Sequence, residues 1–148
     1  MQGVIDEMTV EDFAQVAAVW EEVEMWPHFG EDRAWYERAL ARNPGCALAY
    51  REDGRVLGTV MGAWDGLRAW VYHLAVVKER QGEGLGRALL AAVEERLWRV
   101  GAHQINLGVY DRNPRAEALY LRSGYETAEA KILRKRNQWA SSSRPRGE

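Results

Sequence analysis

Three glycines, Gly82, Gly84 and Gly86, alternate directly before a segment with the apolar spacing of a helix. A glycine-rich turn that opens a helix presents free backbone N–H groups and the positive end of the helix dipole, and both attract phosphate oxygens. Glycine also permits positive φ and a close approach of the backbone to a ligand. The segment at residues 80–97, RQGEGLGRALLAAVEERL, is therefore a candidate phosphate-binding turn.

Two common phosphate-binding motifs do not match this turn. A Walker A loop needs Gly-Lys followed by Ser or Thr, whereas Gly86 is followed by Arg87 and Ala88. The dinucleotide motif needs G-x-G-x-x-G and an acidic residue about 20 positions later, whereas the spacing here is G-x-G-x-G and Gln104 stands near that position. The turn binds a different phosphate group, or it is only a tight corner.

The composition argues against several functional classes of protein. The 148 residues are 47% hydrophobic and 28% charged, with a formal net charge of −2, which gives no support for a nucleic-acid-binding or membrane-surface protein. The single cysteine, Cys46, excludes an internal disulfide; we interpret it as a small apolar residue at a strand start, with a nucleophile as the alternative. A lone cysteine without a signal peptide indicates a cytoplasmic protein. No apolar run approaches the roughly 20 residues of a membrane helix.

The elements that must position the turn alternate between strands and helices. Apolar periodicity and turn residues predict strands over residues 4–7, 47–52, 55–64, 69–77, 104–110 and 125–136. They predict helices over residues 10–24, 32–42, 85–100 and 114–123. This order indicates a mixed α/β sheet covered by helices, in a single domain over residues 1–136 with a flexible tail from residue 137 to 148.

Two further motifs accompany the glycine turn. QGEGLG at residues 81–86 matches Q/R-x-x-G-x-G/A, and LAV at residues 74–76 resembles the end of a fourth strand. Residues 111–125, DRNPRAEALYLRSGY, resemble the pattern N-x-x-A-x-x-x-Y-x-x-x-G-F/Y. Together these motifs resemble the GNAT superfamily of N-acetyltransferases, in which Q/R-x-x-G-x-G/A is the pyrophosphate loop. The chain is most similar to the small bacterial YpeA-type branch of that superfamily.

The resemblance implies the GNAT fold, an α/β fold whose mixed central sheet has about six to seven strands, is flanked by about four helices and is splayed between strands 4 and 5. It also implies acetyl-CoA as co-substrate, with no metal. The pantetheine arm would pair with the fourth strand, and the pyrophosphate would lie on backbone N–H groups of the glycine turn. The implied cofactor-binding residues are Leu74, Ala75, Val76, Gln81, Gly82, Glu83, Gly84, Leu85, Gly86, Arg87, Asn113, Ala116 and Tyr120.

The implied reaction is direct attack of a primary amine on the thioester, without an acyl-enzyme. A lysine-like amine has a pKa of about 10.4, so its proton must pass to a base or to water. A backbone N–H of the fourth strand would polarise the thioester carbonyl. The resemblance assigns protonation of the leaving thiolate to Tyr120; packing of its helix onto the sheet is the alternative role.

The sequence leaves the general base open. Ribosomal-protein N-acetyltransferases of this superfamily carry a glutamate in the fifth strand, in a pattern like L-E-V, and Gly108 stands at that place here. His73 is the best local substitute because it titrates near neutrality, although a partnered structural histidine is the alternative. The other candidates are Asp65, Glu22, Glu24 and His28, and a water wire to bulk solvent needs no base.

The acceptor pocket is expected among the first helices and the hairpins. The aromatic and histidine residues of these regions are Trp26, His28, Phe29, Trp35, Trp64, Trp70 and Tyr72. Some could stack on a cationic or aromatic amine, whereas others, such as Trp20, belong to the core. A small-molecule amine is the favoured acceptor; a protein N-terminus or lysine is the alternative, and a non-catalytic CoA-binding regulatory module is a further one. No nucleic acid or membrane partner is expected, and a homodimer is left open.

Overall fold

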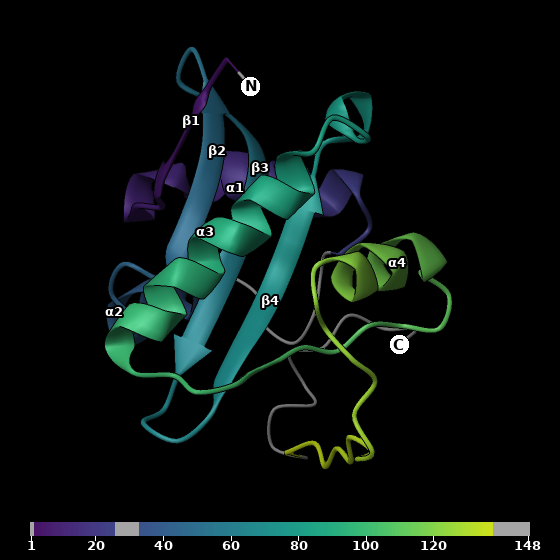
Figure 1. Ribbon diagram of the computed structural model, residues 1–148. Coiled ribbons are helices and arrows are strands. Elements are labelled where there is room, and N and C mark those ends of the chain that lie inside the picture. Colours follow the sequence, from purple (N-terminus) through teal and green to yellow (C-terminus); the bar gives the residue numbers. More distant parts are fainter. Residues whose placement is uncertain (1, 26–32, 138–148) are drawn as a thin grey trace. The chain divides into compact units, whose positions relative to one another are not determined.

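The computed structural model describes residues 2–25 and 33–137 (Figure 1). The chain divides into two compact units, Met1–Leu107 and Gly108–Glu148. The first unit holds the sheet and the first three α-helices, and the second holds α4. The single domain over residues 1–136 stays a prediction, and all but the first residue of the predicted tail lies outside the described residues.

Five strands form one mixed sheet in the order β1-β2-β3-β4-β5. They are β1 (Val4–Glu7), β2 (Ala47–Glu52), β3 (Arg55–Trp64), β4 (Ala69–Val76) and β5 (Ile105–Asn106). Neighbouring strands are antiparallel, except that β5 runs parallel to β4. The predicted mixed α/β architecture is confirmed, although the described sheet has fewer strands than the six to seven expected.

Two predicted strands differ from the structure. The strand predicted over residues 104–110 is only two residues long, and residues 125–136 form no strand within the described chain. In the second segment Ile132 and Leu133 are neighbours, so in an extended chain they would point to opposite sides. They are 65% and 90% exposed, respectively. The segment therefore has no one-sided apolar face that a strand could bury.

The helix α3 (Leu85–Val100) covers one face of the sheet (Figure 1). Its buried side chains are Leu85, Leu89, Leu90, Val93 and Leu97. A Cβ at Gly58 would lie 2.8 Å from Leu89 Cδ1, and one at Gly62 would lie 2.9 Å from Val93 Cγ2. The two β3 glycines therefore let the helix approach the sheet closely. The predicted end of this helix at Gly101 is confirmed, with φ of 112° at that residue.

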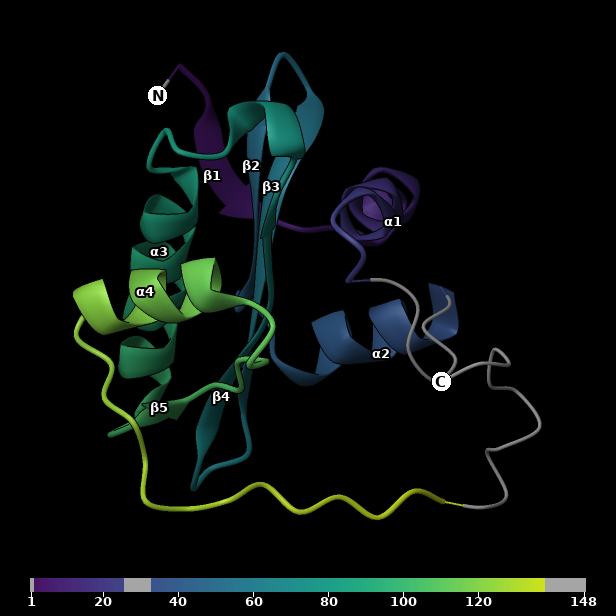
Figure 2. The ribbon, with the colours of Figure 1, turned by 90° about the vertical axis from the view of Figure 1, so that its right-hand side faces the viewer.

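The helices α1 (Phe13–Glu22) and α2 (Arg33–Arg42) lie on the opposite face of the sheet from α3 (Figure 2). A short 3-10 helix, η1 (Val10–Asp12), precedes α1. Before it, the backbone N–H of Thr9 donates to Asp12 Oδ2 at 2.8 Å. Trp20 of α1 is completely buried, so its assignment to the core is confirmed.

The helix α4 (Pro114–Arg122) belongs to the second unit. Asn113 caps it as predicted, because its Oδ1 accepts the backbone N–H of Ala116 at 3.1 Å. Pro114 is the first helical residue, and Gly124 follows the end of the helix with φ of 97°. The sequence therefore predicted this helix and both its end signals.

Candidate functional site

A β-bulge interrupts β4 at His73. Thr59 of β3 faces Ala75 and Met61 faces Tyr72, so β4 has one residue more than β3 between these pairs. His73 has φ of 51°, in the left-handed region that residues other than glycine seldom adopt. Because of the extra residue, some backbone N–H and C=O groups of β4 do not take part in the regular hydrogen bonding with β3. These groups lie directly before the LAV segment at residues 74–76.

A buried hydrogen-bond chain holds the bulge. The Thr59 hydroxyl donates to the carbonyl oxygen of His73 at 2.8 Å and accepts from Trp20 Nε1–H at 2.9 Å. Thr59 is fully buried. The Trp20 ring also stacks on the His73 imidazole, with centroids 4.3 Å apart and planes inclined by 29°. The side chain of Thr59 and the ring of Trp20 thus fix both the carbonyl and the imidazole of the strained residue.

Within the described residues, one edge of β4 is paired with another strand over only a small part of its length. On this edge β4 pairs with β5 only at Ala69 and Trp70, so residues 71–76 have no partner in β5. The sheet opens between these two strands, as the resemblance implied. An unpaired strand edge presents N–H and C=O groups that another extended chain can bind. The predicted contacts of Leu74, Ala75 and Val76 lie on this part of β4.

The glycine turn follows β4 and the short 3-10 helix η2 (Lys78–Arg80). Gly82 and Gly84 have φ of 84° and 86°, and Gly84 caps α3 with open space where a Cβ would lie. The helix ladder starts with the N–H of Ala88, which donates to the Gly84 carbonyl. The N–H groups at the first three helical positions, Leu85, Gly86 and Arg87, therefore have no partner inside the helix. Such a turn fits a pyrophosphate.

Arg80 anchors the turn to β2. Its guanidinium donates to both carboxylate oxygens of Glu52 at 2.7 and 2.8 Å, and its Nε lies 3.0 Å from both oxygens of Glu83. Hydrogen bonds from Arg80, and secondarily from Tyr50, lower the pKa of Glu52 to about 2. The charge of Glu83, which lies inside the turn, is thus paired with a cation.

Two more contacts tie the turn to its surroundings. The side-chain amide of Gln81, the first residue of the motif, donates to the carbonyl of Val76 at the end of β4 at 2.9 Å. The backbone N–H of Lys78 donates to Glu22 Oε2, at the end of α1, at 2.6 Å. The candidate base Glu22 is thereby engaged in holding the chain between β4 and the turn.

The structure places the other candidate bases differently. His73 lies at the bulge, where its ring stacks on Trp20 and contacts the edge of Trp35 at a centroid distance of 5.5 Å. Asp65 is in the β3–β4 turn, where its Oδ1 accepts the N–H groups of Leu67 and Arg68 at 2.7 Å each. These backbone hydrogen bonds lower the pKa of Asp65, so it is a weaker base than an ordinary aspartate.

The last two candidate bases are Glu24 and His28. Glu24 follows α1 with φ of 60°, and His28 lies outside the described residues.

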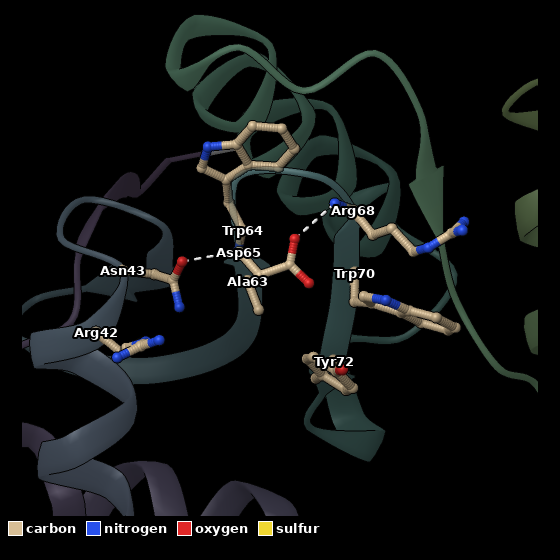
Figure 3. Close-up of a pocket in the computed structure, with 8 residues that line it drawn as sticks. All are labelled: Arg42, Asn43, Ala63, Trp64, Asp65, Arg68, Trp70 and Tyr72. Atoms are coloured by element: carbon tan, nitrogen blue, oxygen red, sulfur yellow. Dashed lines mark hydrogen bonds between the residues drawn. The ribbon is translucent and has the colours of Figure 1, made fainter.

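A pocket of about 310 Å³ lies beside the turn between β3 and β4 (Figure 3). We call it the hairpin pocket; its lining residues are Arg42, Asn43, Ala63, Trp64, Asp65, Arg68, Trp70 and Tyr72. The rings of Trp70 and Tyr72 are nearly parallel, with centroids 6.4 Å apart. Asn43 Oδ1 accepts the backbone N–H of Trp64 at 2.7 Å and so joins the end of α2 to the hairpin.

The sequence named some of these residues and missed others. Trp64, Trp70 and Tyr72 line the pocket, as expected of part of the aromatic set, whereas Trp26 and Phe29 lie outside the described residues. Residue types and spacing did not indicate Thr59 or the pocket residues Arg42, Asn43, Ala63 and Arg68. The sequence feature that could have indicated these pocket residues was the predicted turn at Asp65. This turn places the end of β3 beside the start of β4.

The remaining predicted residues lie in the second unit or in the core. Tyr120 of α4 contacts Tyr125, with ring centroids 5.9 Å apart, and burial raises the pKa of its hydroxyl. Gly108 lies after β5 rather than inside it. Cys46 is buried, and burial raises the pKa of its thiol, which opposes a nucleophilic role.

Among residues 2–25 and 33–137, no group of three or more His, Cys, Asp or Glu side chains could hold a metal ion. No helix in the described part of the chain is long and apolar enough to cross a membrane.

Residues 7–125 match the family described as the acetyltransferase (GNAT) family. The PaiA N-acetyltransferase from Thermoplasma acidophilum, in complex with coenzyme A, has a TM-score of 0.77 at 17% identity, over 88% of this chain and 94% of that chain. AAC(6′)-Iy, in complex with the bisubstrate analogue CoA-S-monomethyl-acetylneamine, has a TM-score of 0.76 at 15% identity, over 93% and 99%. The ribosomal-protein-S18-alanine N-acetyltransferase from Escherichia coli has a TM-score of 0.74 at 21% identity, over 85% and 79%.

Proposed function

Because the chain belongs to the acetyltransferase (GNAT) family, we propose that it transfers the acetyl group of acetyl-CoA to a primary amine by direct attack of the amine on the thioester. A small-molecule amine is the favoured acceptor. One observation carries the proposal: three features that could bind acetyl-CoA follow one another along the chain. They are the bulge at His73, the open edge of β4 and the glycine turn before α3. The structures similar in fold include two solved with CoA or a CoA-containing bisubstrate analogue.

In this proposal the glycine turn binds the pyrophosphate of CoA through the N–H groups of Leu85, Gly86 and Arg87. The open edge of β4 binds the pantetheine arm, and a backbone N–H beside the bulge donates to the thioester oxygen. That hydrogen bond strengthens as negative charge develops on the oxygen when the amine attacks. The C–N bond forms, the C–S bond breaks, and CoA leaves as its thiolate.

Two protons must move during this transfer. The attacking amine loses one, either to the His73 imidazole or through water to bulk solvent. The leaving thiolate gains one, and we assign its donor to Tyr120 of α4. Burial raises the pKa of the Tyr120 hydroxyl, so it is protonated at neutral pH but is a weaker acid than a free tyrosine. Donation to the thiolate therefore requires close contact between the hydroxyl and the sulfur.

The test is the substitution Tyr120→Phe. We expect kcat to fall about hundredfold, the lower end of the range for loss of a general acid, while the affinity for CoA changes little. CoA release across a panel of amines and a CoA titration measure the two quantities. Tyr110→Phe is the control, because Tyr110 is 53% exposed in the same unit. An unchanged kcat in Tyr120→Phe would remove Tyr120 from the mechanism.

A protein N-terminus is the second candidate acceptor. It is favoured by the likeness in fold to the ribosomal-protein-S18-alanine N-acetyltransferase, although Gly108 stands where that class is expected to carry a glutamate. The same panel decides between them when it includes peptides with free N-termini beside small amines. If CoA binds tightly but no acceptor releases free thiol, the chain is a CoA-binding module without this activity.

A further inference from the structure

The hairpin pocket opens on the same face of β4 as the His73 ring. Gly62 and its partner Val71 point toward α3, because a Cβ at Gly62 would meet Val93 and Leu97 of that helix. Trp70 and Tyr72 alternate with Val71, so they point to the opposite face. The bulge turns His73 to this face as well, where its ring contacts α1 and α2.

The charges of the pocket favour an anion. Two guanidinium groups, those of Arg42 and Arg68, and one carboxylate, that of Asp65, line it. Both arginines are exposed, and neither forms an ion pair within the described ranges 2–25 and 33–137. The Asp65 carboxylate already accepts two backbone N–H groups of its own turn. The Asp65 carboxylate also attracts the nearby Arg68 guanidinium, and the lining as a whole has a net charge of one positive unit.

Arg68 is the better placed of the two arginines. It directly precedes β4, and residues 68, 70 and 72 alternate along the hairpin arm. Figure 3 shows the Arg68 side chain extending beside the Trp70 ring, whereas Arg42 enters from the end of α2 on the other side of the pocket. An acceptor lying along β4 from the bulge would reach Tyr72, then Trp70, then Arg68.

We propose that the hairpin pocket selects acceptor amines that carry a carboxylate, with Arg68 binding that carboxylate and the rings of Trp70 and Tyr72 contacting a flat or apolar portion between the two groups. The inference rests on the proposed transfer of an acetyl group near the bulge. A guanidinium binds a carboxylate through paired charge-assisted hydrogen bonds, and Arg42 adds a positive field from the opposite rim. A volume of about 310 Å³ suits part of a small ligand.

The strand geometry sets the length of this acceptor. Arg68 and Tyr72, the last residue before the bulge, are four residues apart, which is about 13 Å along a regular strand. The Arg68 side chain extends beside Trp70 and so shortens this distance (Figure 3). An amine at the bulge and a carboxylate at Arg68 are therefore separated by on the order of 10 Å, a distance that an extended tripeptide spans. Short peptides and amino acid derivatives with a free carboxylate meet this requirement, whereas simple amino acids are too short.

The experiment compares a matched pair of acceptors, the tripeptide Gly-Gly-Phe with a free carboxylate and the same tripeptide as its C-terminal carboxamide. Affinity for the CoA-bound protein is measured by calorimetry, and turnover by release of CoA. We expect the acid to bind about tenfold to hundredfold more tightly than the amide, as charge-assisted hydrogen bonds predict, with the ratio falling as salt rises.

Arg68→Gln should bring the ratio of the two affinities close to one, and Arg42→Gln should reduce it less. Arg38→Gln, an exposed position on α2 outside the pocket, should leave it unchanged.

Each outcome separates this inference from the proposed function. Equal binding of acid and amide, or an acid preference that survives Arg68→Gln, overturns the inference and leaves the acetyl transfer intact. If the protein turns over only amines that lack a carboxylate, the inference is likewise overturned and the acetyl transfer stays intact. Loss of the preference in Arg42→Gln but not in Arg68→Gln likewise overturns the inference, because the carboxylate then binds Arg42 instead. If no amine of any kind releases CoA, the proposed function fails, while the calorimetric ratio still decides whether the pocket binds a carboxylate.

Discussion

The Thr59 hydroxyl joins the His73 carbonyl to the Trp20 indole, and a substitution can remove that link alone. Thr59→Val keeps the shape of the side chain but removes one hydrogen bond to each partner. The buried indole N–H then lacks its acceptor, which costs about 1–3 kcal/mol of stability. Because the bulge loses its fixed carbonyl, we expect kcat to fall by about tenfold, with little change in CoA affinity. Steady-state kinetics and thermal unfolding measure the two effects.

Thr59→Ser distinguishes positioning from mere packing. Serine restores the hydroxyl but lacks the methyl group, so it should recover kcat even where some stability is lost. If Thr59→Val keeps the wild-type kcat, or if serine restores stability but not kcat, Thr59 does not position the reacting backbone.

Residue types alone could locate only part of this site. His73 was a candidate because it precedes the LAV segment, and its place on β4 agrees with that expectation. The bulge and the Thr59 contact depend on how β3 and β4 are aligned, and residue types do not state that alignment. The Arg68 side chain was missed for the same reason, since only the folded hairpin places it beside Trp70.

At the scale of elements, the turn before α3 makes a prediction with a close control. Gly84→Ala places a Cβ on a residue with φ of 86°, which strains the helix start by roughly 1 kcal/mol or more. We expect a lower melting temperature and at least about tenfold weaker CoA binding, because the strain moves the N–H groups that hold the pyrophosphate. Calorimetric titration with CoA measures the affinity.

Gly54→Ala is the matched control for strain alone. Gly54 has φ of 76°, lies in the β2–β3 turn and, like Gly84, has open space where a Cβ would lie. It should lose similar stability without losing CoA affinity. Equal effects of both substitutions on CoA binding would mean that the turn before α3 does not hold the phosphate.

The attachment of η1 to the sheet predicts a pH dependence. Arg51 of β2 donates to both oxygens of Asp12 at 2.8 and 2.6 Å, and this hydrogen bonding is the main reason that the pKa of Asp12 is lowered. A lowered folded-state pKa adds stability above the unfolded value of about 3.9 and loses it as the pH falls through the folded value. Asp12→Asn should therefore be less stable at neutral pH by about 1–3 kcal/mol and show a shallower loss of stability below about pH 4.

Urea unfolding at several pH values measures this difference. Glu95→Gln is the control, because Glu95 pairs with Arg99 at the exposed surface of α3, where an ion pair contributes little. If Asp12→Asn and wild-type protein lose stability in parallel below pH 4, Asp12 is not the group responsible.

The elements that the sequence predicted well carry their own end signals. The helix α3 has an apolar stripe and Gly101 at its end, and α4 has Asn113 before it and Gly124 after it. In contrast, β5 is short and residues 125–136 form no strand within the described chain. Strand formation depends on a partner from elsewhere in the chain, so a run of suitable residue types is insufficient.

At the scale of the whole molecule, the three sequence motifs fall in both compact units. The fourth-strand segment and the glycine turn belong to Met1–Leu107, whereas Asn113 and Tyr120 belong to Gly108–Glu148. The match of the family to residues 7–125 includes parts of both units. A cytoplasmic location stays a prediction.

Acetyl-CoA should stabilise the whole protein if the proposed function is correct. A ligand that binds only the folded state adds about 2.7 kcal/mol of stability at a concentration of 100 times its Kd. For a chain of this size that corresponds to a rise of roughly 5–10 °C in the melting temperature. Differential scanning fluorimetry with acetyl-CoA at millimolar concentration measures the shift.

Pantetheine, which lacks the pyrophosphate, is the control ligand and should give a smaller shift in melting temperature. Gly84→Ala should reduce the shift with acetyl-CoA but leave the shift with pantetheine nearly unchanged. A melting curve that acetyl-CoA leaves unmoved would contradict the assignment of the glycine turn and of the open β4 edge together, because both contribute to the same binding free energy.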